Sequence, residues 1–218
     1  PYARWVGRIT ELDSLVKTGA PEPSVLSGDQ LRRTQIGYGL TMEDMELILQ
    51  PMVEEAKEAV GSMGDDAPLA VLSEQYRGLH HFFKQNFSQV TNPPIDSLRE
   101  SRVMSLRTRL GNLGNILDEH ETQCDVLALD SPVLSNAEFE AMRRYMGHAA
   151  AEIDCTFDPA SGEHALRDAL NRIRREAEEA VRAGCTHLIL SDEAVDAARA
   201  AVPMILAAGG VHSHLERS

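Results

Sequence analysis

The chain has 218 residues, of which 43% are hydrophobic and 25% are charged, and its formal net charge is −13. This length fits one soluble domain with a sizeable core, and no apolar run approaches the roughly 20 residues that a membrane-spanning helix needs. The excess of negative charge repels phosphate backbones and therefore argues against nucleic acid as a partner.

The three cysteines, Cys124, Cys155 and Cys185, are far apart and odd in number. No C-x-x-C pair is present, so the sequence predicts no zinc site or iron–sulfur cluster built from this chain alone. Dispersed thiols of this kind suit a reducing cytoplasm, and we expect them to be buried and inert. The N-terminus, Pro1–Trp5, has neither an initiator Met nor a signal peptide, which suggests an excised segment.

Residues 1–60 are predicted to form an N-terminal helical or irregular segment. Glycines and prolines interrupt residues 1–28, and a short helix is expected over residues 31–36. Thr41 is a candidate N-cap, because Glu43 and Asp44 follow it and favour the positive end of a helix dipole. Apolar residues then recur at helical spacing: Met45, Ile48, Leu49, Met52 and Val53.

Residues 61–218 are predicted to form an α/β body. Residues 61–66 indicate a loop, and the continuous apolar run over residues 69–72 is typical of a buried strand. Ser73 can cap a helix with an apolar stripe, which must end before the prolines at 93 and 94. Asp96 can cap a further helix that extends to Leu110. The apolar stripe of the earlier helix consists of Leu79, Phe82, Phe83 and Phe87.

The second half of the chain alternates strands and helices more clearly. Strands are predicted over residues 126–129, 153–157 and 187–190. Helices are predicted after a capping box at Ser135, over residues 164–183, and from Pro203 toward His214. This alternation favours a layered α/β domain with a mostly parallel sheet flanked by helices.

The segment from Val90 to Asp96 contains two consecutive prolines. Pro93 and Pro94 fix φ and donate no backbone hydrogen bond, and Asn92 is held extended by the proline after it. Such a segment is stiff, and it leaves carbonyl groups and the polar side chains of Thr91 and Asn92 available. A rigid wall for a small polar molecule and a corner between two helices explain it equally well.

Other chemical patterns are weaker than their structural alternatives. The glycines at 61 and 64 could form an anion-binding nest, but a tight structural loop is favoured. Asp65 and Asp66 are adjacent, so loop capping is favoured over acid–base catalysis. Surface or packing roles are favoured over metal binding for four histidines: His80, His81, His212 and His214.

No catalytic nucleophile is indicated by the sequence. G-x-S-x-G and phosphate-binding glycine motifs are absent. His187 follows Cys185 by two residues, on the same side of a strand if one forms there, and a buried pair is the favoured interpretation.

Two long motifs carry a resemblance to a known family. Residues 61–73, GSMGDDAPLAVLS, and residues 87–100, FSQVTNPPIDSLRE, resemble the glutamate synthase large subunit. Both match its central domain, between an amidotransferase domain and an FMN-binding barrel, and weaker matches follow in the same order along essentially the whole chain. The resemblance is to the bacterial, NADPH-dependent form.

This resemblance implies a chain that is not catalytic alone. In the family, glutamine is hydrolysed by an N-terminal cysteine nucleophile, and the ammonia crosses to the FMN domain, where it adds to 2-oxoglutarate. The imine is then reduced to glutamate with electrons that pass through FMN and an iron–sulfur cluster. The resemblance implies that these cofactors lie in the parent enzyme and not in this segment, and that a small NADPH-oxidising subunit is a partner.

The resemblance also assigns a role to the stiff segment. The central domain bridges the two reaction sites and forms part of the ammonia tunnel wall. We expect the following residues to line or constrict this tunnel: Thr91, Asn92, Pro93, Pro94, Ile95 and Asp96. We expect the following residues to form a loop at a domain interface: Ser62, Met63, Gly64, Asp65 and Asp66.

Two other interpretations compete with the connecting domain. One is a stand-alone binding or regulatory protein that reuses the domain, and the missing initiator Met counts against it. The other is an independent small enzyme, and the missing nucleophile and cofactor motifs count against it.

Overall fold

The computed structural model describes residues 2–16, 26–59, 69–74, 77–83 and 95–218. Contacts divide the chain into two compact units, an N-terminal unit over Pro1–Met142 and a C-terminal unit over Arg143–Ser218. Helix α5 (Asn136–Met146) begins in the first unit and ends in the second. The predicted boundary between residues 60 and 61 lies outside the described residues and stays a prediction.

The described elements of the N-terminal unit are short. Its α-helices are α1 (Tyr2–Val6), α2 (Gly28–Gly37), α3 (Gln50–Glu55) and α4 (Glu100–Val103), and its strands are β1 (Thr10–Glu11), β2 (Thr108–Leu110) and β3 (Leu127–Leu129). Its 3-10 turns are η1 (Leu12–Leu15), η3 (Ala70–Leu72), η4 (Leu79–Phe83) and η5 (Glu121–Cys124), and η2 (Asp44–Leu49) is π-helical.

Strand β3 is the centre of the N-terminal sheet. It pairs in parallel with β1 and antiparallel with β2, and all three of its residues are buried. Leu127 is fully covered and Val126 is nearly so, which places the core of this unit along β3. The strand predicted over residues 126–129 is therefore confirmed.

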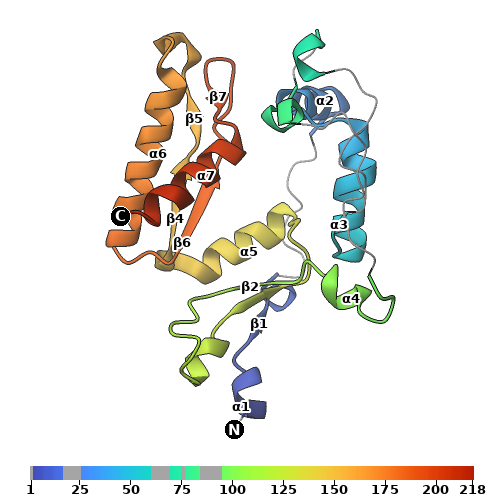
Figure 1. Cartoon of the computed structure of the whole chain (residues 1–218), viewed down its shortest axis with the longest axis vertical. Helices are drawn as coiled ribbons and strands as arrows, with labels where there is room; N and C mark the ends of the chain where they lie inside the picture. Colours follow the sequence, from blue (N-terminus) through green and yellow to red (C-terminus); the bar gives the residue numbers. More distant parts are fainter. Residues whose placement is uncertain (1, 17–25, 60–68, 75–76, 84–94) are drawn as a thin grey trace. The chain divides into compact units, whose positions relative to one another are not determined.

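The C-terminal unit is built around a βαβ arrangement (Figure 1). Strand β4 (Ala150–Asp154) pairs in parallel with β6 (His187–Ser191), and helix α6 (Ala165–Arg182) connects them. Helix α6 contacts β4, and α7 (Met204–Leu215) contacts both α6 and β6. Four further elements complete the unit: η6 (Gly147–Ala149), η7 (Pro159–Ser161), and the antiparallel pair β5 (Thr156–Phe157) with β7 (Ala200–Ala201).

One apolar cluster holds the C-terminal unit together. Ile173 and Ala177 from α6 are completely buried against Ile153 of β4 and Ala207 of α7. This burial follows from the apolar stripe of α6, because residues at helical spacing share one face. The helix predicted over residues 164–183 is confirmed, and Gly184 ends it with a φ of 97°.

The α/β class is confirmed, but a mostly parallel sheet is not. The described strands form one three-stranded sheet and two two-stranded sheets, with both parallel and antiparallel pairs. Alternating strands and helices predicted a single sheet, but long-range pairing divides the strands among three.

Two local predictions in the N-terminal unit are wrong. The apolar run at 69–72 forms the 3-10 turn η3, and Val71 and Leu72 are more than 70% exposed. The helix predicted from Asp96 to Leu110 is limited to α4, because residues 108–110 pair with β3 as strand β2.

Candidate functional site

Most residues of the predicted tunnel and interface loop lie outside the described residues. This holds for Thr91 to Pro94 and for Ser62 to Asp66. Their predicted roles therefore stay predictions. Only Ile95, which is half-buried, and Asp96, which is exposed, are described.

Asp96 anchors the turn that leaves the stiff segment. Its Oδ1 atom accepts a hydrogen bond from the Leu98 amide at 2.9 Å, and its carbonyl accepts from the amides of Arg99 and Glu100. These bonds hold the backbone between the prolines and α4 in one conformation. Asp96 thus caps a turn before α4, although Arg99 is the N-cap residue of the helix itself.

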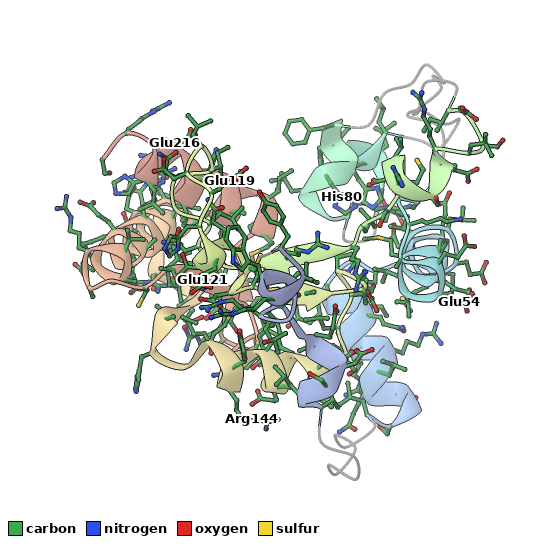
Figure 2. The ribbon with its side chains drawn as sticks, turned by 90° about the horizontal axis from the view of Figure 1, so that it is seen from below. Glu54, His80, Glu119, Glu121, Arg144 and Glu216 are labelled. Carbon is green, nitrogen blue, oxygen red and sulfur yellow. The ribbon has the colours of Figure 1, made fainter. Side chains whose placement is uncertain are left out.

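The paired histidines at 80 and 81 lie near an acidic side chain. Figure 2 shows His80 on the short helix η4, and the centroids of the two imidazole rings are 4.1 Å apart. Burial acts to raise the pKa of Asp44, but the hydrogen bonds from Thr41, together with the electrostatic effect of the nearby imidazoles, outweigh it, so this pKa lies below its ordinary value. The predicted cap is confirmed here, because Thr41 Oγ1 accepts from the Asp44 amide at 3.1 Å.

The histidines of α7 lie beside carboxylates. His214 Nε2 lies 2.8 Å from Glu178 Oε2 on α6, and His212 Nε2 lies 3.5 Å from Glu216 Oε2. Across the described ranges, no group of three histidine, cysteine or acidic side chains is placed to hold a metal ion.

The cysteines occupy different environments. Cys155 is completely buried, and this burial raises the pKa of its thiol to about 11. Cys124 and Cys185 are half-buried, and Cys185 Sγ lies 3.8 Å from the His148 carbonyl oxygen. Cys155 therefore agrees with the prediction of a buried, inert thiol, because the thiolate is the reactive form.

A charged network joins the end of β4 to α6. Arg172 donates through Nη2 to the carbonyl oxygens of Asp154 and Thr156, each at 2.9 Å. The Asp154 carboxylate accepts from the Thr156 amide at 2.9 Å, from Thr156 Oγ1 at 2.7 Å, and from Arg199. Between β4 and β5, the Cys155 amide donates to the Ser191 carbonyl and the Cys155 carbonyl accepts from the Val202 amide, so the network adds side-chain bonds to a continuous set of backbone bonds.

The same network lowers the pKa of Asp154. Burial favours the neutral acid, but the hydrogen bonds from Thr156 and Arg199 favour the carboxylate more strongly, so the pKa lies below its ordinary value. Arg172 also pairs with Glu176 at 3.2 Å. The main charges of this network are thus compensated within the unit, which indicates a structural role.

Two hollows are lined by described residues, one in each unit. The hollow in the C-terminal unit has a volume of about 280 Å³ and lies between β5 and the first turns of α6, beside Arg172. The hollow in the N-terminal unit is larger, about 760 Å³, and lies at the end of α2. Arg32 and Arg77 face it together with apolar side chains.

The sequence did not point to the arginines of these sites. Arg172 is adjacent to the apolar stripe of α6, and a charged residue beside a buried face is the only local signal. Arg199 and Asp154 are 45 residues apart, so their pairing is visible only in the folded chain. Within the described parts of the chain, no helix is both long and apolar enough to cross a membrane.

Comparisons of the sequence with known proteins identify its family. The family model of the glutamate synthase central domain matches residues 33–218. The chain is 68% identical over 220 residues to the large chain of NADPH glutamate synthase from Azospirillum brasilense, and the match covers 100% of the chain and 14% of that relative.

Two more distant relatives match over nearly the same span. NADH glutamate synthase from Saccharomyces cerevisiae is 39% identical over 229 residues, covering 100% of the chain and 11% of that relative. Ferredoxin-dependent glutamate synthase of spinach chloroplasts is 40% identical over 218 residues, covering 99% of the chain and 13% of that relative. The chain thus spans only about a seventh or less of these relatives. The resemblance predicted from its motifs is confirmed, and the chain belongs to the glutamate synthase central domain family.

Proposed function

We propose that this chain is the connecting domain of a glutamate synthase large chain. The observation that carries the proposal is its match, end to end and at 68% identity, to only 14% of the Azospirillum large chain. The whole enzyme would convert glutamine, 2-oxoglutarate and a reductant into two molecules of glutamate and so assimilate ammonia in the cytoplasm. The name of that relative supports NADPH as the reductant.

Catalysis would belong to the flanking domains. An amidotransferase domain would release ammonia, and an FMN-binding domain with an iron–sulfur cluster would reduce the imine, with electrons from a small NADPH-oxidising subunit. The donors in this chain do not fit such a cluster, because the buried Cys155 thiol has a raised pKa and the described residues form no group of three ligands.

The domain would contribute the wall of an ammonia tunnel through residues 91–96. Ammonia is small and neutral, so a tunnel must keep its bore and exclude water. Two consecutive prolines restrict the backbone there, and the hydrogen bonds of Asp96 fix the turn that follows. A stiff segment with a few polar atoms suits this task better than a mobile loop.

The tunnel assignment can be tested by placing a bulky side chain in the proposed tunnel of the intact large chain with its small subunit. Asn92→Trp should raise the number of glutamine molecules hydrolysed per 2-oxoglutarate consumed, because ammonia escapes instead of crossing. Asn136→Trp, at an exposed helix start in α5, is the matched control and should leave the ratio unchanged. Tight coupling in Asn92→Trp would contradict the tunnel assignment.

A second measurement tests whether this piece lacks a reaction of its own. The purified chain should show neither flavin absorbance nor glutaminase activity. Either signal would contradict the connecting-domain proposal, since the cofactor and the nucleophile are assigned to the flanking domains.

A further inference from the structure

The hollow at the end of α2 combines apolar walls with two arginines. Its volume is about 760 Å³, and it is formed where α2 ends and the chain turns into η2. Its described apolar lining consists of Ile36, Leu40, Met42 and Met45. Arg32 lies one helical turn before Ile36, and Arg77 reaches the hollow from a distant part of the sequence.

Backbone hydrogen bonds fix the wall of this hollow. The Leu40 amide donates to the Gln35 carbonyl at 2.9 Å, and Thr41 and Asp44 cap the following helix through reciprocal hydrogen bonds. The apolar side chains on this wall stay open to solvent, since Ile36 is 58% and Met42 is 70% exposed. A preformed apolar wall that is open to water is typical of a surface that another group covers.

The two arginines lack acidic partners within the described residues. Some arginines of the chain are paired: Arg8 with Asp125 and Arg172 with Glu176. Arg32 and Arg77 form no ion pair among the residues that the structure describes, and both line the hollow. They are therefore placed to donate hydrogen bonds to an anion that enters it.

We infer that this hollow receives a segment of a neighbouring domain of the same large chain, in which an aspartate or glutamate lies beside apolar side chains. The inference rests on the proposed function, because that segment belongs to the part of the polypeptide outside these 218 residues. Arginine binds carboxylates through two parallel hydrogen bonds, and the apolar wall covers the side chains next to the carboxylate. A nucleic acid does not fit, because it offers no apolar side chains and meets a net charge of −13.

The size of the hollow and the length of the relatives support a peptide segment as the occupant. A volume of about 760 Å³ holds several side chains. The chain covers only 11–14% of its relatives, so most of the polypeptide that could supply the segment lies outside it. Because the segment is in the same chain, its effective concentration is high, and two charge-assisted hydrogen bonds are enough to orient it.

Photo-crosslinking in the intact large chain with its small subunit tests the inference. A benzophenone amino acid at Met42, on the rim of the hollow, should crosslink to a segment outside these 218 residues. Mass spectrometry should find an aspartate or glutamate among apolar residues in that segment. The double variant R32E/R77E should lower the crosslink yield by about fivefold or more, because each arginine would then repel the carboxylate.

Matched variants separate charge recognition from loss of folding. R33E changes a neighbouring residue of α2 that does not line the hollow, so it should leave the yield unchanged. R32K/R77K keeps both charges and should keep most of the yield. Replacing the mapped acid by arginine in the R32E/R77E background should restore the crosslink, which a misfolded variant cannot do.

Two outcomes would overturn the inference. Crosslinks confined to these 218 residues or to the small subunit would show that no neighbouring domain of the large chain occupies the hollow. A yield that is equal in wild type and R32E/R77E would show that the arginines do not recognise the occupant. If either outcome occurs while Asn92→Trp uncouples the enzyme, this inference fails and the proposed function stands.

Discussion

The two units differ in how much of their apolar surface they cover themselves. Of the 26 large apolar residues that are exposed in the described parts of the chain, 21 precede Arg143 and only five follow Met142. Among the described residues, the two units nevertheless bury the same number of apolar residues, eight each, although the C-terminal unit is the shorter one. The C-terminal unit is therefore closed around its own core, whereas the N-terminal unit presents apolar side chains for others to cover.

The loop after β2 is one example of exposed apolar surface in the N-terminal unit. Side-chain oxygens of Asn112 and Asn115 accept hydrogen bonds from the amides of Gly114 and Leu117, so the loop is well ordered. Yet Leu117 is 87% exposed at its tip. Figure 2 labels Glu119 and Glu121, which follow Leu117 in the sequence. An ordered loop that holds leucine in water is typical of a domain that is completed by a neighbour.

The largest expected difference in the free energy of unfolding is between a substitution in the core and one at this exposed leucine. Ile173→Ala removes a side chain with no exposed surface and should lower the free energy of unfolding of the chain by about 3 kcal/mol. Leu117→Ala should change it by less than about 0.5 kcal/mol. Chemical denaturation followed by circular dichroism measures both. Equal losses would mean that the N-terminal unit has a core of its own around this loop.

The second effect tests the charged network of the C-terminal unit. Arg172→Met keeps most of the side-chain volume but leaves the carbonyl oxygens of Asp154 and Thr156 without their donor. We expect a loss of about 2 kcal/mol, because hydrogen bonds to charged donors contribute about 1.5–3 kcal/mol.

Arg175→Met is the control for the loss of a cation from α6. The Arg175 guanidinium forms only a long, exposed contact of 4.0 Å with Glu179, so the change should be near zero. If the two variants lose the same free energy, the carbonyl contacts of Arg172 do not stabilise the unit.

The two units also differ in how well their structure could be predicted from the sequence. In the C-terminal unit, the stripe of α6, the glycine that ends it and the strand of β6 are local patterns that packing reinforces. Local preference and tertiary structure agree there. The capping box at Ser135, which lies in the N-terminal unit, is confirmed as well, since Glu138 Oε2 accepts from the Ser135 amide at 2.6 Å.

In two other segments of the N-terminal unit, local patterns and tertiary contacts disagree. The run at 69–72 has no periodicity, so its apolar character alone could not distinguish a buried strand from an exposed turn. Residues 108–110 leave the predicted helix because β3, 17 or more residues later in the chain, supplies their hydrogen bonds. Among the site residues, the stiffness of the proline segment could be predicted from its sequence. The hydrogen bond from Arg172 to the Asp154 carbonyl at the end of β4 could be seen only in the folded chain.

A smaller change in the free energy of unfolding is expected when either of two glycines of the C-terminal unit is replaced by alanine. Gly184 has a φ of 97°, which side chains rarely adopt, so Gly184→Ala should cost about 1 kcal/mol. Gly209 lies within α7, and a Cβ atom there meets nothing within 4 Å. Gly209→Ala should therefore increase the free energy of unfolding by about 0.5–1 kcal/mol, because alanine favours a helix over glycine. Thermal unfolding of the two variants should shift in opposite directions, and shifts of the same sign would contradict this account of α7.

The smallest expected effect is a pH dependence that differs between the units. Asp154 has a pKa below its ordinary value in the folded chain, because Thr156 and Arg199 outweigh the effect of burial. Its contribution to stability is therefore fully present above the unfolded pKa, about 3.9, and is lost as the pH falls through the folded pKa. Asp154→Asn should be less stable than wild type at pH 7 and should lose less stability between about pH 5 and pH 3.

Asp125 of the N-terminal unit is the comparison for this effect. A hydrogen bond from Arg8 lowers the pKa of Asp125 as well, with Arg8 Nε 2.6 Å from Oδ1, but both side chains are exposed. The Arg199–Asp154 ion pair is about as exposed as the Arg8–Asp125 pair, so salt should weaken both. Asp154 also accepts two hydrogen bonds from Thr156, which salt does not screen, so 0.5 M NaCl should remove most of the acid sensitivity due to Asp125 and less of that due to Asp154. The measurement is the slope of unfolding free energy against pH for Asp125→Asn and Asp154→Asn at low and high salt. If salt acts equally on both, the hydrogen bonds from Thr156 do not contribute to the lowered pKa of Asp154.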